Sequence, residues 1–422
     1  MTERNLNGLQ VAALLVSASY GIGLLFGSGE LALRHGMAGG IYGVATAVGM
    51  FALAFAGRRL WAAGVPVWEW FGRAYGPRLQ RAVALLSVVW MAGVLAAQIH
   101  GGVSVTGLLG LPKGSSYVIV LCLIFCASRM NLRFASMVFA LCLLSSAVVL
   151  VYALVVTGGW SLYLHALPAF TRDLATFSGP RLFAVTVAVS LLVCTGADYH
   201  QFMLAARRPS GAVVGCILAG IALVAVGLLP AALVVTMQQG GALVDVADSK
   251  QVVPLVLARV AGALGPGADK LMLVALSTAA LGSGAAILRA MVSALASAVP
   301  GTLRDRQSVL SVIGLAVGAA VASRGQGIVD TMVSVNVIYI ASIGICLVAL
   351  LRNRALAPRH AATIMATGFM GSLAAYVAGW TGWLAGDPDL MSMGAGLGLS
   401  GITAALLAFG ATGGCQASRA DG

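Results

Sequence analysis

The stretch ASYGIGLLFGSGELALRHG, residues 18–36, decides the fold. It belongs to an apolar run that is long enough to form one spanning helix, but glycines interrupt that run. Ser19 and Tyr20 stand directly before Gly21, and Gly23 follows. A run of this kind can unwind near the bilayer midplane, where free carbonyls bind a cation and free amides bind an anion. Alternatively, the glycines form a close-packing helix face. This stretch alone favours neither interpretation.

A second interrupted run lies much further along, at VCTGADYHQFMLAARRPSGA, residues 193–212. Here Gly196 precedes Asp198 and Gln201. Two broken helices five spans apart predict an inverted repeat, with the functional site where the first helices of the two halves meet. An ionisable Asp198 at membrane depth is a functional-site hypothesis. The alternative places it at the cytoplasmic interface, where it pairs with Arg207 or caps a helix.

The composition excludes most soluble classes. Of 422 residues, 60% are hydrophobic and 9% are charged, and the mean hydropathy is +0.97, so a lipid bilayer is the expected solvent. The net charge of +12 comes from basic residues scattered between apolar runs, which argues against a nucleic-acid partner. Histidines and carboxylates form no cluster at catalytic or metal spacing, so we expect no enzyme and no cofactor.

We predict an all-α polytopic protein with about twelve transmembrane helices in a single transmembrane domain, residues 1–422. Residues 8–157 form the first repeat half, residues 181–351 the second, and residues 360–412 two additional helices. The candidate spans cover approximately residues 9–28, 38–57, 80–109, 116–128, 134–157, 181–198, 210–236, 268–297, 307–323, 328–351, 360–381 and 391–412.

The loops on one side of these spans carry about twice as many lysines and arginines as those on the other. This bias predicts that both termini are cytoplasmic. We therefore expect a multi-pass protein of the bacterial inner membrane.

The eighth run, LMLVALSTAALGSGAAILRAMVSALAS at residues 271–297, places hydroxyls side by side at Ser277 and Thr278. Two hydroxyls with free carbonyls suit a small hard cation. The alternative is that each hydroxyl bonds back to its own helix. In the third run, Gln98 and His100 either line a cavity or pack in the interior.

Three segments together resemble the sodium/solute symporter family: ASYGIGLLFGSGELALRHG, DYHQFMLAARRPSGAVVG (residues 198–215) and LSTAALGSGAAILRAMVSAL (residues 276–295). The resemblance covers about residues 8–351. It implies the LeuT-type fold, in which ten core helices form two inverted five-helix halves and helices 1 and 6 are discontinuous.

The resemblance also implies site residues. The sodium ligands would be three backbone carbonyls and two hydroxyls, from Ala18, Gly21, Val274, Ser277 and Thr278. The substrate would lie between the broken helices, against Ser19, Tyr20, Gly23, Ala197, Asp198 and Gln201.

This chain departs from the family pattern in two ways. It lacks the helix that many members carry before the core, and Phe202 stands where an arginine usually follows the glutamine. The function implied is cation-coupled uptake of a small organic solute by alternating access, with sodium as the expected ion. The alternatives are proton coupling on the same fold, or a transporter-like sensor that binds solute for a signalling partner. The residues identify neither the solute nor the oligomeric state.

Overall fold

The computed structural model describes residues 4–130, 132–243, 246, 248–299 and 301–417; for residues 132–140, 142–143, 146, 279, 302, 304 and 409–417 it describes the backbone only. These residues form α-helices and three short 3₁₀ helices. In the first part of the chain they are α1 (Gly8–Ser19), α2 (Ile22–His35), η1 (Gly36–Gly40), α3 (Ile41–Ala63), α4 (Val67–Tyr75), α5 (Pro77–Leu108), α6 (Lys113–Arg129), α7 (Leu132–Val156), α8 (Trp160–Leu164), α9 (Ala166–Asp173) and η2 (Leu174–Thr176).

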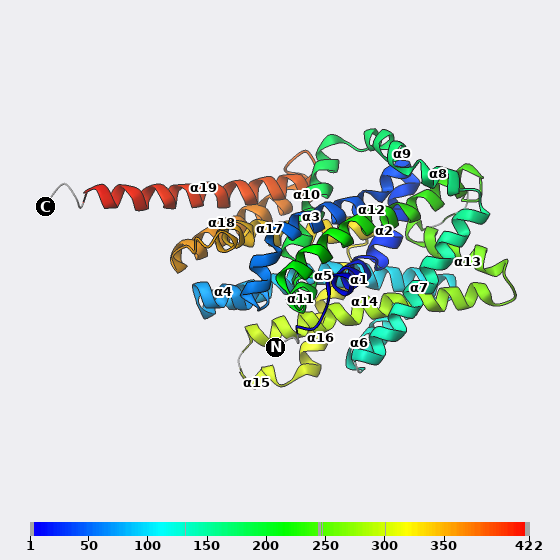
Figure 1. Cartoon of the computed structure of the whole chain (residues 1–422), viewed down its shortest axis with the longest axis horizontal. Coiled ribbons are helices and arrows are strands. Elements are labelled where there is room, and N and C mark those ends of the chain that lie inside the picture. Colours follow the sequence, from blue (N-terminus) through cyan, green and yellow to red (C-terminus); the bar gives the residue numbers. More distant parts are fainter. Residues whose placement is uncertain (1–3, 131, 244–245, 247, 300, 418–422) are drawn as a thin grey trace.

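The second part of the chain continues in the same way. Its helices are α10 (Gly179–Thr195), α11 (Ala197–Leu204), α12 (Pro209–Gln239), η3 (Ser249–Gln251), α13 (Val252–Gly262), α14 (Ala268–Ala298), α15 (Gly301–Arg304), α16 (Gln307–Ala322), α17 (Ile328–Leu351), α18 (Pro358–Trp380) and α19 (Pro388–Ala417). The bundle they form is shown in Figure 1, with the end of α19 extending beyond the other helices.

Seven helical segments of the described chain are long and apolar enough to cross a membrane. The pair α10 and α11, bent by 42° at its junction, makes eight if it is counted as one span. The segments are Ile22–Ala63, α5, α12, α14, α17, α18 and the Pro388–Ala408 part of α19. The all-helical fold class is therefore confirmed, while the count of about twelve spans stays a prediction.

Local sequence explains where several helices begin. At the start of α1 the Asn7 side chain accepts from the Gln10 amide at 2.8 Å, and the Gln10 side chain accepts from the Asn7 amide at 2.9 Å. This reciprocal capping box satisfies two amides that the first turn leaves free. The helices α5, α10, α12 and α18 instead carry proline in their first turn, where a missing N–H costs nothing.

The core is built from small residues at helix crossings. The helices α3 and α12 pack along each other, and a Cβ placed on Gly43 would lie 2.6 Å from the Cα of Gly227. Only glycine permits this approach, which is typical of close-packed membrane helices. The long helix α5 contacts α14, α16 and α17, so it runs through the middle of the bundle.

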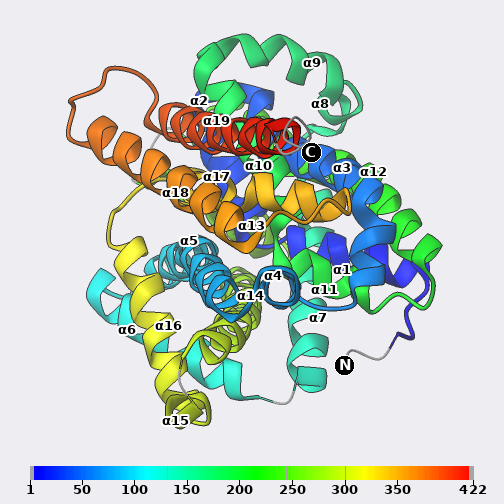
Figure 2. The same ribbon diagram turned by 90° about the vertical axis from the view of Figure 1, so that its left-hand side faces the viewer.

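The two additional helices, α18 and α19, pack against each other and against α17 along one side of the molecule (Figure 2). A charged network ties them to the rest. Arg181, in the first turn of α10, pairs with Asp330 at the start of α17, with Asp389 at 2.6 Å and with Asp387 at 3.6 Å. One guanidinium thus links α10, α17 and the α18–α19 connection.

Candidate functional site

The first helix break lies between α1 and α2. Tyr20 closes α1 by donating its amide to the Val16 carbonyl at 2.7 Å, and the extended Gly21 (φ −84°, ψ −175°) starts α2. The Gly21 carbonyl accepts the amides of Leu24 and Leu25 at 3.1 and 3.0 Å.

Other backbone groups at this break have no partner. Within the described part of the chain, no hydrogen bond engages the carbonyls of Ala18, Ser19 or Tyr20 or the amide of Gly21. Ser19, Tyr20 and Gly21 are buried, and buried backbone groups are almost always paired in native proteins. This break therefore leaves free the polar groups that a ligand can engage.

The second break, between α10 and α11, is filled by side chains. Gly196 is extended (φ −69°, ψ 118°), which frees the carbonyls of the last α10 residues. The His200 ring donates to the Cys194 carbonyl at 2.9 Å, and the Tyr339 hydroxyl reaches the Thr195 carbonyl at 3.4 Å. Side chains of the protein itself therefore bond to two of the carbonyls that this break frees.

The two breaks meet because α1 and α11 contact each other. The Ser19 hydroxyl donates to the Leu15 carbonyl at 2.8 Å and interacts with the Tyr199 hydroxyl of α11. Ser19, Tyr20 and Ala197 are buried, and the Tyr20 hydroxyl has no hydrogen-bond partner among the described residues.

The other expected substrate residues have different surroundings. Gly23 faces α17, since a Cβ there would lie 3.0 Å from the Met332 sulfur. Gln201 is exposed. Gly23 is therefore packed against α17, whereas Gln201 lies at the surface of the protein.

Asp198 lies in the first turn of α11. Its side chain is partly exposed, but the Oδ1 atom is shielded from solvent and has no hydrogen-bond partner in the described part of the protein. No ion pair among these residues includes it. The neighbours close enough to feel its charge are Tyr42 of α3, Tyr199 and Tyr339. The pairing with Arg207 considered from the sequence is thus absent from this conformation.

The expected sodium ligands are only partly gathered. The Thr278 hydroxyl donates to the Val274 carbonyl at 2.8 Å, whereas the shielded Ser277 hydroxyl has no partner among the described residues. Ala18 is exposed. The α14 side chain that lies against Gly21 is that of Ser283, about one and two-thirds turns beyond Ser277. The described residues hold no group of three or more His, Cys, Asp or Glu suited to a transition metal.

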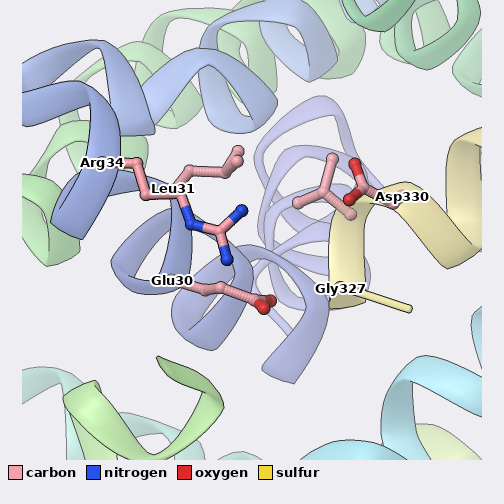
Figure 3. A pocket seen from close by; sticks show the side chains of 6 residues that line it. Glu30, Leu31, Arg34, Gly327 and Asp330 are labelled. Atoms are coloured by element: carbon pink, nitrogen blue, oxygen red, sulfur yellow. The ribbon is translucent and has the colours of Figure 1, made fainter. Parts of the chain in front are cut away.

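A small cavity of about 20 Å³ lies between α2 and the start of α17, with room for about one water. The charged ends of Glu30 and Arg34 point into this space opposite Gly327 and Asp330 (Figure 3). The Glu30 carboxylate accepts the Ile328 amide at 2.9 Å and the Ser249 hydroxyl at 3.1 Å. It therefore caps α17, where the helix dipole favours an anion.

Sequence reasoning missed several of these partners. Nothing in the primary structure connects Glu30 with the start of α17, or marks Ser283 as the neighbour of Gly21. Arg289 of α14 donates to the carbonyls of Ala127, Ser128 and Met130, which caps the end of α6. The position of Arg289 inside an apolar run indicates that this side chain has partners. Which carbonyls it contacts depends on tertiary packing and cannot be read from the sequence.

The fold of this chain is similar to that of several solved membrane transporters. A substrate-bound, outward-open Na⁺-coupled sialic acid symporter matches with a TM-score of 0.68 at 14% identity, over 96% of this chain and 90% of that chain. MHP1, a nucleobase-cation-symport-1 family transporter in a closed conformation with bromovinylhydantoin bound, matches with a TM-score of 0.57 at 17% identity, over 96% and 91%. A manganese transporter of Eremococcus coleocola, in complex with an aromatic bis-isothiourea substituted compound, matches with a TM-score of 0.53 at 13% identity, over 94% and 92%.

No protein-family model and no curated protein sequence matches the chain. At these identities the likeness to solved structures shows the fold alone. That fold is the LeuT-type fold expected from the sequence, and the protein is a multi-pass membrane protein.

Proposed function

We propose that the protein is a secondary active transporter that couples the uptake of a small organic solute to a cation, with sodium as the expected ion. The observation that carries this proposal is the contact between two broken helices, one of which leaves backbone carbonyls unpaired. Broken helices whose free ends face a cavity are how secondary transporters hold ions and solutes. The shared fold with cation-coupled transporters adds support.

Sodium coupling is supported by oxygen groups on α1 and α14. The unpaired carbonyl of Ala18 and the unpartnered hydroxyl of Ser277 are oxygen ligands, which hard cations prefer. In this proposal the carbonyls of Gly21 and Val274 and the Thr278 hydroxyl complete the site when the conformation changes. Sodium drives transport only if it binds one conformation more tightly than the other, by a coupling of about 1–3 kcal/mol.

A second candidate, proton coupling, is favoured by Asp198. A carboxylate with one shielded and unpartnered oxygen is costly at membrane depth. Protonation of Asp198 would remove that cost. The proton would be released again when the carboxyl group becomes exposed to the other side of the membrane. The two candidates differ in which residue carries the ion.

Binding of ²²Na⁺ to the purified protein tests the first candidate without knowledge of the solute. Ser277→Ala and Thr278→Ala should each weaken binding by about 5- to 150-fold, since each removes a ligand worth about 1–3 kcal/mol. Ser297→Ala is the matched control, because this exposed hydroxyl of α14 bonds only to the Ser293 carbonyl of its own helix. Failure of the wild type to bind ²²Na⁺ would refute sodium coupling.

Proteoliposomes containing a pH-sensitive dye test the second candidate. If protons are the coupling ion, solute mixtures should acidify the lumen, and Asp198→Asn should abolish the signal while leaving any ²²Na⁺ binding intact.

The orientation of the protein in the membrane is part of the proposal as well. A fluorescent protein fused after α19 should fluoresce in the bacterial cytoplasm, as the distribution of positive charge predicts.

A further inference from the structure

Gln98, in the middle of α5, is buried without a partner for its amide. Its side chain is 4% exposed, and its Oε1 atom has no hydrogen-bond partner among the described residues. An unsatisfied buried acceptor costs about 1–3 kcal/mol. Such groups are rare in native proteins and mark a missing partner, whether water, ion or ligand.

Several other amide side chains in the described bundle donate to backbone carbonyls, although Asn336 Oδ1 and Gln326 Oε1 lack a partner as Gln98 Oε1 does. The Asn336 amide of α17 donates to the Ala188 carbonyl at 2.9 Å, and the Gln251 amide donates to the Ser104 carbonyl at 3.2 Å. These side chains join helices to one another. Gln98 makes no such bond, so a role in holding helices together does not explain it.

Gln98 points at the first helix break. A Cβ on Gly21 would lie 3.7 Å from Gln98 Nε2 and 3.2 Å from the Ser283 hydroxyl oxygen of α14. A Cβ on Gly284, the residue after Ser283 in α14, would lie 3.5 Å from the Cβ of Gln98. The glycines at Gly21 and Gly284 thus keep side-chain bulk away from the place where α5, α14 and the break converge.

The groups gathered there have a definite chemistry. Gln98 offers an acceptor and a donor, Ser283 offers a hydroxyl, and the Gly21 amide adds a donor. Neither side chain placed against Gly21 carries a charge, and a buried ionic ligand would need a countercharge. The orphaned atom is an acceptor, so its missing partner is a donor.

We propose that Gln98 and Ser283 form a solute subsite at the break between α1 and α2, which binds an uncharged group that bears an N–H or O–H donor beside an acceptor. This inference rests on the proposed transport function and names the class of solute that the break receives. Asp198 belongs to the other break and plays no part in this subsite. The part of the solute that enters this break is therefore neutral and forms hydrogen bonds, as an amide or a polyol does.

The first test measures the ligand-free protein. Gln98→Leu removes an unsatisfied acceptor, so its melting temperature should equal or exceed that of the wild type. Thr106→Val is the matched control on α5, because Thr106 is buried and its hydroxyl bonds to the Gly102 carbonyl of its own helix. A clear loss of thermal stability in Gln98→Leu, with Thr106→Val unchanged, would show a structural role and overturn the proposal.

The second test asks which solutes bind. A thermal-shift panel compares the neutral urea, uracil, glutamine, glucose and myo-inositol with the anionic acetate and glutamate and the cationic choline and lysine. Glutamine is a zwitterion with an uncharged side chain. At saturation at least one neutral member should raise the melting temperature by about 1–3 °C. Gln98→Leu and Ser283→Ala should lose this shift, and Thr106→Val should keep it.

The outcomes separate this inference from the proposed function. Stabilisation by charged members only, by no neutral member, or equally in Gln98→Leu overturns the subsite. If ²²Na⁺ still binds in that case, the transport proposal stands and only the solute assignment fails.

Discussion

Replacing Arg181 by glutamine should destabilise the protein, because it leaves three carboxylates facing one another without their shared cation. Arg181 is 23% exposed, while the side chains of Asp389 and Asp387 are 9% and 14% exposed and that of Asp330 is 44% exposed. Removing one partner of a buried ion pair costs about 3–5 kcal/mol. An exposed pair contributes about 0–1 kcal/mol.

The partial burial of the Arg181 network lies between these limits, so we expect a loss of about 2–4 kcal/mol. With an unfolding entropy of roughly 2 cal/mol/K per residue, this corresponds to a melting temperature lowered by roughly 2–5 °C. Thermal unfolding of the detergent-solubilised protein, followed by tryptophan fluorescence at a fixed heating rate, measures the difference.

A double-mutant cycle gives the decisive comparison. Adding Asp389→Asn to Arg181→Gln removes one of the stranded carboxylates, so the double variant should be more stable than Arg181→Gln alone. Arg172→Gln is the control, because Arg172 is 77% exposed and, among the described residues, its ion pair is with its neighbour Asp173 alone. The reasoning fails if Arg181→Gln melts within about 1 °C of the wild type, or if the two substitutions are simply additive.

Three further substitutions, two of them with a comparison variant, test packing and helix capping. Gly43→Ala should lower the melting temperature by an amount equivalent to about 1–3 kcal/mol through steric overlap, whereas Gly398→Ala, with open space around it, should be neutral or stabilising. Arg289→Leu should cost about 1–3 kcal/mol by freeing the carbonyls at the end of α6, and a Lys at this position should recover only part of the loss. Glu30→Ala should cost about 1–2 kcal/mol by uncapping α17, measured by the same melting assay.

Apolar runs predicted the helices well. The run expected at residues 328–351 coincides with α17, and the one expected at residues 268–297 differs from α14 by one residue. Hydropathy succeeds here because the bilayer requires long apolar segments whose backbone is bonded internally. The short α4 and the helices α8 and α9 were not anticipated, since brief amphipathic turns between spans carry no such signal.

The candidate site was less accessible to sequence reasoning. The interruption near Gly21 could be expected from glycine and polar residues within one run, but Gln98 and Ser283 reach it from two other helices. Thr278 shows the same limit, because its hydroxyl bonds to its own helix, the alternative weighed from the sequence. Periodicity describes one helix at a time, whereas neighbours are set by tertiary packing. The two repeat halves and the sodium ligands stay predictions.

The helix breaks in the first and sixth apolar runs differ in how much their conformation depends on a bound solute or ion. The break at Gly196 is braced internally by His200 and Tyr339, so it keeps its shape in the empty protein. The break at Gly21 has no such brace in the described chain. Its amides should therefore exchange deuterium faster than those near Gly196 and slow down when solute or ion binds. Part of the binding free energy would then offset the ordering of the break at Gly21, while the break at Gly196 would act as a rigid pivot.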